Sequence, residues 1–124
     1  MTAPRPPAVD CWLNPSFRAS EYRPEFLVRV AREYFHRERE IFEVTPLETL
    51  LRQMDDAGVE RAILTIDPSD PEPYAEVRNA FPGRFILSAM FDPTRGMETV
   101  RLLEKVVTKH DIRLARVTPF LVNR

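Results

Sequence analysis

Polar side chains that could do chemistry stand at the carboxyl ends of the strands that the sequence predicts. Asp67 and Asp92 each precede a proline, Asn14 and Thr118 hold equivalent places, and Trp12 lies two residues before Asn14. Ligands bind at the carboxyl ends of the strands both in open α/β sheets and in barrels. We therefore take these five residues as a candidate pocket, in which the two carboxylates could hold a hard cation such as Mg²⁺ weakly. A plainer interpretation stays open, in which the aspartates cap turns and the tryptophan packs in the core.

Other side chains with catalytic potential lack the required spacing. His36 lies among charged residues on a predicted helix, and His110 lies at a helix C-terminus, where a cation stabilises the helix dipole. Neither histidine is at ligand spacing to the other or to Cys11, which we interpret as a small buried side chain within a strand. Three glycines, with no phosphate-loop or nucleophile-elbow motif, leave little for phosphate binding or acyl transfer. Spacing alone identifies no catalytic residue and no metal site.

The best-defined element is a helix followed by a strand, between Thr45 and Asp67. Thr45 and Glu48 have the spacing of a capping box, Pro46 falls at the first helical position, and Gly58 follows as a left-handed stop. The apolar stripe between these signals comprises Leu47, Leu50, Leu51, Met54 and Ala57. The run that leads to Asp67 is almost continuously apolar, which predicts a strand covered on both faces. We expect a core that includes Leu50, Leu51, Met54, Ile63, Leu64 and Ile66.

The rest of the chain repeats this alternation of strand and helix. Strands are predicted near 8–13, 61–66, 85–90 and 114–118, and helices near 24–35, 46–57, 73–81 and 96–109. The alternation predicts an α/β fold with a parallel sheet and right-handed crossovers. Two architectures have this pattern, a small open doubly wound parallel sheet and a (β/α)₈ barrel of which four strands are half. A barrel typically needs about 250 residues, so a length of 124 residues favours the open sheet.

Composition excludes several classes of function. A net charge of −1 provides no basic surface for nucleic acid. No apolar run approaches the roughly 20 residues of a membrane span, and the N-terminus lacks the apolar core of a secretory signal. The single cysteine excludes an internal disulfide and fits a reducing compartment. We expect a cytoplasmic protein with one domain at 8–124, after a disordered proline-rich lead-in at 1–7.

Four segments, in order, resemble the amidohydrolase-related family. They are VDCWLNP from Val9, TPLETLLRQMDDAGVERAILT from Thr45, FPGRFILSAMFDPTRGMETVRLLEKVV from Phe81, and RLARVTPF from Arg113. The family typically has D-x-H-x-H in the first segment, M-D-x-x-G-V-x-x-A-V-L in the second, P-x-R-F in the third, and a basic residue, an apolar residue and H-P in the fourth. Its members are metal-dependent hydrolases and decarboxylases of the amidohydrolase superfamily, built on a (β/α)₈ barrel. The resemblance therefore implies the N-terminal half of a barrel, against the argument from length.

The resemblance also implies a degenerate metal site. Trp12 and Asn14 stand where the family has the two metal-binding histidines of H-x-H, and Thr118 stands in place of the histidine of H-P. The family's remaining ligands belong to later strands, beyond Arg124. We expect no metal cofactor in this chain, although complete family members imply a divalent metal of the zinc type.

Two functions are consistent with this resemblance. The first is half of a metal-dependent hydrolase or decarboxylase of small carboxylate or C–N substrates, a fragment inactive by itself, whose small-molecule substrate would require a longer parent chain. The alternative is a non-catalytic scaffold subunit that pairs with a complete barrel. A homo- or hetero-oligomer would then cover the open sheet edges. We expect neither a nucleic acid nor a membrane as partner.

Overall fold

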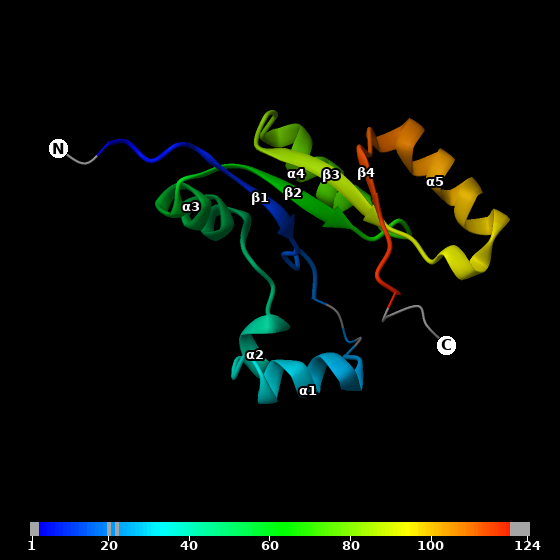
Figure 1. Cartoon of the computed structure of the whole chain (residues 1–124), viewed down its shortest axis with the longest axis horizontal. Helices are drawn as coiled ribbons and strands as arrows, with labels where there is room; N and C mark the ends of the chain where they lie inside the picture. The colour runs from blue at the N-terminus through cyan, green and yellow to red at the C-terminus, as the bar shows by residue number, and fades with distance from the viewer. Residues whose placement is uncertain (1–2, 20, 22, 120–124) are drawn as a thin grey trace.

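The computed structural model describes residues 3–19, 21 and 23–119, which alternate between strands and helices (Figure 1). The strands are β1 (Ala8–Leu13), β2 (Val59–Ile66), β3 (Phe85–Met90) and β4 (Leu114–Arg116). The helices are α1 (Glu25–Glu33), α2 (Glu38–Ile41), α3 (Leu47–Ala57), α4 (Glu72–Ala80) and α5 (Met97–His110), with a 3₁₀ helix, η1 (Pro93–Arg95), before α5. The predicted strands are confirmed, except that β2 begins two residues earlier and β4 ends before Val117.

The four strands form one parallel, curled, open sheet in the order β1-β2-β3-β4. Each strand pairs with the next one along the chain, so the strand order lacks the reversal that a doubly wound sheet requires. The connecting helices α3, α4 and α5 pack against one face of this sheet, where they share a core cluster with β2 and β3. The fold is therefore α/β with the geometry of a half-barrel, and the other face of the sheet carries no helix layer among the described residues.

The burial pattern shows which face the helices cover. Ala62, Leu64 and Ile66 of β2 pair with Phe85, Leu87 and Ala89 of β3, and all six are buried. They form one cluster with residues from α3, α4 and α5: Leu50, Met54, Ala75, Val77 and Val106. The alternate strand residues, including Ile63 and Ile86, point to the opposite face, which we call the open face.

The expected core is thus confirmed at four of six positions. Leu50, Met54, Leu64 and Ile66 are buried in the main cluster. Leu51 is only part-buried because it packs at the edge of that cluster. Ile63 was placed wrongly, because strand alternation directs its side chain to the open face.

Helix α3 ends as predicted but begins differently. Gly58 has a φ of +72° and closes the helix in the left-handed conformation. The predicted capping box is wrong: Pro46 occupies the cap position with an extended backbone, and no side chain caps the helix. The helix consequently begins at Leu47, and the Thr45 amide donates to the Ser16 carbonyl, 2.7 Å away, instead of belonging to the helix.

The first helical segment lies apart from the sheet. One helix was predicted near 24–35, but the chain forms α1 and the short α2, with His36 between them at a φ of +54°. Figure 1 shows this pair set off from the sheet. The large apolar residues of this segment are mostly exposed, namely Phe26 and Leu27 of α1 and Tyr34 and Phe35 just after it, whereas Ala31 is buried. The helical spacing predicted the helix correctly but not a core beneath it.

Residues 3–7 of the proline-rich lead-in have no regular secondary structure, while Met1 and Thr2 lie outside the described residues. No helix within the described ranges combines the length and apolarity that crossing a membrane would need.

Candidate functional site

A cavity of about 360 Å³ opens at the carboxyl ends of β1 and β2. The loop after β1 and the segment that joins β2 to α4 form its walls. Its lining residues are Ser16, Phe17, Arg18, Ala19, Asp67, Asp70, Pro73 and Tyr74. This is the end of the sheet where parallel α/β folds bind ligands, and the cavity includes one of the five predicted site residues, Asp67.

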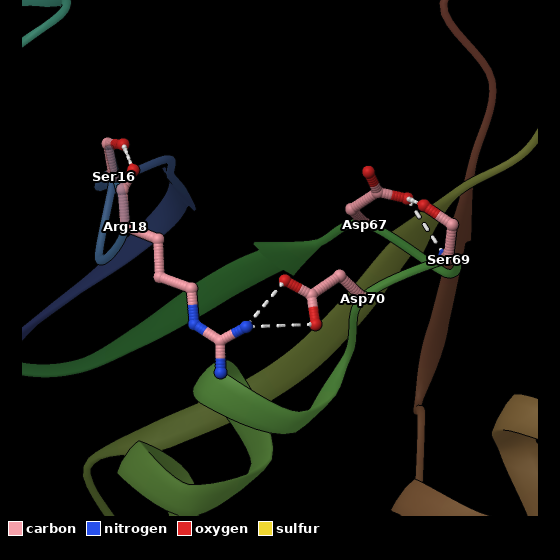
Figure 2. Close-up of polar contacts among 5 residues, drawn as sticks. All are labelled: Ser16, Arg18, Asp67, Ser69 and Asp70. Atoms are coloured by element: carbon pink, nitrogen blue, oxygen red, sulfur yellow. Dashed lines mark hydrogen bonds and ion pairs between the residues drawn. The ribbon is translucent and has the colours of Figure 1, made fainter. Parts of the chain in front are cut away.

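The charged groups of this cavity are already partnered (Figure 2). Arg18 reaches from the first loop and donates through Nη1 to the two carboxylate oxygens of Asp70, at 3.5 and 3.2 Å. Asp67 turns toward Ser69 and accepts hydrogen bonds from its amide (2.8 Å) and its hydroxyl (2.6 Å). Because the Arg18–Asp70 pair is largely exposed, it contributes at most about 1 kcal/mol to stability. It nevertheless joins the two loops that border the cavity.

Tyr74 supplies a neutral hydroxyl to the same cavity. Its ring lies 5.3 Å from that of Phe17, centroid to centroid. Burial raises the pKa of the Tyr74 phenol, and the negative charges of Asp67 and Asp70 raise it further. The phenol therefore stays protonated over the physiological pH range and can donate a hydrogen bond.

A second polar cluster lies on the open face and centres on Arg116. Arg116 Nε donates to Ser88 Oγ at 3.1 Å, and Ser88 Oγ is 3.3 Å from Thr65 Oγ1. The guanidinium also donates through Nη2 to the carbonyl of Cys11, and its carbon lies 5.3 Å from the centroid of the Trp12 ring. We call Trp12, Thr65, Ser88 and Arg116 the open-face cluster.

This cluster spans the sheet from one edge strand to the other. In a flat sheet, three strand spacings of about 4.8 Å would put β4 about 14 Å from β1, which is farther than an arginine side chain extends. Arg116 on β4 nevertheless contacts Cys11 and Trp12 on β1. The contact requires the sheet to curl toward the open face, which brings β4 closer to β1.

The five predicted site residues do not converge on one cavity. Asp67 lines the cavity described above, whereas Trp12 is 57% exposed on the open face. Asp92 accepts a hydrogen bond from the Thr94 amide at 2.9 Å and caps η1, as the plainer interpretation proposed. Thr118 is buried, and its hydroxyl lies 2.8 Å from the sulfur of Met90. Asn14 is exposed and is not among the residues that line the cavity.

The structure also places the two histidines and the cysteine that the sequence offered as candidates. His36 is exposed, and His110 is buried at the end of α5, with Nε2 3.8 Å from Glu72 Oε1. The interpretation of Cys11 as a buried residue is wrong: its thiol is free and exposed, because β1 is an edge strand with an irregular register. Sequence reasoning missed Arg116, Ser88 and Thr65 as site residues. The available signal was the alternation of side chains along β3 and β4. This alternation puts Ser88 on the same face as Met90, two residues later, and Arg116 on the same face as both.

The side chains of Trp12, Asn14 and Thr118 do not suit the zinc-type metal that the resemblance implies for complete family members. An indole ring has no lone pair to donate, and the Trp12 ring packs against a cation. The Thr118 hydroxyl contacts a thioether, and Asn14 would supply only a neutral amide oxygen. Within the ranges 3–19 and 23–119, no group of three or more His, Cys, Asp or Glu side chains is placed to hold a metal ion.

No protein-family model, no curated protein and no solved structure matches this chain. The amidohydrolase resemblance therefore stays a prediction.

Proposed function

We propose that this chain is the N-terminal half of an amidohydrolase-like barrel, which is catalytically incomplete by itself and works only when a second half covers its open face. By resemblance, the complete barrel would be a metal-dependent hydrolase or decarboxylase acting on a small carboxylate or C–N substrate. The observation that carries the proposal is the sequential parallel order of the four strands, with the core helices on one face of a curled sheet. A closed barrel continues this arrangement, whereas a doubly wound sheet interrupts it.

The open face supports a need for covering. It carries the apolar residues Val9, Ile63, Ile86, Met90 and Leu114, of which Val9 and Leu114 are exposed. Both edge strands, β1 and β4, pair on one side only among the described residues. An unpaired strand edge is a template for further pairing, and a second half-barrel would satisfy the edges and bury the apolar residues together.

Sedimentation of the purified chain over a range of concentrations tests this proposal. Leu114 on the open face and Val107 on the outer surface of α5 are both 41% exposed, so Leu114→Lys and Val107→Lys form a matched pair of variants. We expect the chain to form a dimer that Leu114→Lys dissociates and Val107→Lys leaves intact. A reading frame that continues beyond Arg124, with histidines after further strands, would supply the second half from the same chain. The proposal fails if the chain is a monomer at every concentration and its reading frame has no such continuation.

A second candidate function is a non-catalytic subunit that pairs with a complete barrel. The specific observation that favours it is the contact of Trp12 with the Arg116 guanidinium, because Trp12 stands where the resembled family has a metal-binding histidine. A stable heteromer with a complete, active barrel, whose turnover is unchanged by Trp12→Ala, would support this function. A heteromer in which Trp12→Ala or Asn14→Ala lowers turnover would support the first function instead.

A further inference from the structure

Arg116 differs from the other part-buried arginines in its electrostatic environment. Three arginines of the described chain are part-buried, Arg78, Arg84 and Arg116. Arg78 lies 3.9 Å from a carboxylate oxygen of Asp111, and Arg84 lies 2.8 Å from one of Asp55. Arg116 has no ion pair with any described carboxylate. A partly desolvated guanidinium without a counter-charge is costly, and a bound anion would offset that cost.

The Arg116 side chain is also held in a fixed orientation. Ser88, which is fully buried, accepts from Nε, and the Cys11 carbonyl accepts from Nη2. Trp12 packs against the guanidinium, at 5.3 Å from its carbon to the ring centroid. The N–H groups of a guanidinium lie in its plane, so contact with an aromatic face leaves unused donors accessible at the edge. Nη1 makes no hydrogen bond to a residue of the described ranges, which leaves its two donors for a ligand.

We propose that the open-face cluster is an oxyanion-binding site in which Arg116 binds a carboxylate or phosphate group beside Trp12. A planar guanidinium fork matches two oxygens of either group, and charge-assisted hydrogen bonds of this kind are roughly twice as strong as neutral ones. The contacts to Ser88 and Cys11 orient the fork before the ligand arrives, which reduces the entropy lost on binding. The site goes beyond the proposed function because it belongs to this chain alone and requires neither a second half-barrel nor a metal.

The tryptophan of the cluster provides the measurement. Trp12 is the only tryptophan of the chain, so its fluorescence reports on this cluster without labelling. We would titrate the full chain with sodium acetate and, separately, with inorganic phosphate, each compared with sodium chloride at the same ionic strength. A saturable change with acetate identifies a carboxylate ligand, and one with phosphate identifies a phosphate ligand. A response equal to that of chloride is a general salt effect only and overturns the proposal.

Variants separate binding by Arg116 from general attraction of anions. Arg116→Met keeps much of the side-chain length but removes the charge, and Arg61→Met removes an exposed arginine from the neighbouring part of the same sheet. We expect Arg116→Met to weaken binding at least about tenfold and Arg61→Met to leave it within about twofold. Equal binding by Arg116→Met and the parent chain refutes the site.

A conservative variant covers the case in which Arg116→Met does not fold, as judged by circular dichroism. Arg116→Lys keeps the charge but loses the planar fork, so we expect it to bind the anion more weakly than the parent chain does. Unchanged affinity in Arg116→Lys would refute fork recognition. Sedimentation of the same samples reports pairing separately, so failure of the anion site and failure of the half-barrel proposal can be distinguished.

Discussion

Leu64 lies at the centre of β2 with its side chain fully buried, and its truncation tests which face of the sheet carries the core. Leu64→Ala removes a side chain that belongs to the cluster formed by the strands with α3, α4 and α5. Replacing a buried leucine by alanine costs the transfer free energy of the lost carbons plus the cost of the cavity, in total about 2–5 kcal/mol. Ile63→Ala is the matched control, because the neighbouring side chain points to the open face and is only part-buried. We expect it to cost roughly 1 kcal/mol.

The two variants should separate clearly in thermal unfolding. For a chain of 124 residues, the entropy of unfolding near the transition is about 0.26 kcal/mol per kelvin. A loss of about 3 kcal/mol at Leu64 therefore lowers Tm by about 12 °C, and a loss of about 1 kcal/mol at Ile63 lowers it by about 4 °C. Circular dichroism at several heating rates, together with urea unfolding, measures both effects. The assignment of the core to one face is refuted if Leu64→Ala costs less than about 0.5 kcal/mol, or if Ile63→Ala costs as much as Leu64→Ala.

Three further outcomes are expected. Gly58→Ala should lower the free energy of unfolding by about 1–2 kcal/mol through backbone strain alone, because its φ is +72° and no atom beyond its chain neighbours lies within 4 Å of the added carbon. Urea unfolding that shows no loss would contradict the left-handed cap. Because the pKa of Tyr74 is raised in the folded state, the contribution of its phenol to stability is fully present below the unfolded pKa of about 10.0 and is lost as the pH rises through the folded value. Tyr74→Phe should therefore remove part of the loss of stability at alkaline pH. Identical alkaline stability profiles for the two proteins would argue against burial of the phenol. Elemental analysis of chelator-free protein should find no stoichiometric zinc, and Trp12→His combined with Asn14→His should not produce metal-dependent hydrolysis. The reason is that a hydrolytic zinc site needs about three protein ligands and an open position. Near-stoichiometric zinc in the parent chain would show that a working site had been misjudged.

The sequence alone determined the elements of this fold, because their signals are local. Gly58 after an apolar stripe ends α3, the pair Asp67-Pro68 follows β2 directly, and the pair Asp92-Pro93 follows β3 after one residue. Each signal depends on the conformational preferences of one residue and its immediate neighbours. The alternation of strand and helix then indicated a parallel sheet without any knowledge of contacts.

The same local rules gave wrong results where two conformations compete nearby. Thr45 and Glu48 have the spacing of a capping box, but Pro46 between them adopts an extended backbone and delays the helix by one residue. The apolar residues between Phe26 and Phe35 have helical spacing, yet most of the large ones are exposed in the described structure. Periodicity states which residues share a face, but it does not state what that face packs against.

Tertiary structure decided the candidate sites. Asp67 and Arg18 lie 49 positions apart in sequence and line one cavity because β1 and β2 are adjacent in the sheet. The contacts of Arg116 with Ser88 and Trp12 depend on strand register and on the curl that brings β4 toward β1. Curl and register arise from the packing of the whole sheet against its helices, so no local pattern encodes them. Residue types and spacing therefore identified the ends of the strands, whereas the curvature of the sheet determined which side chains meet there.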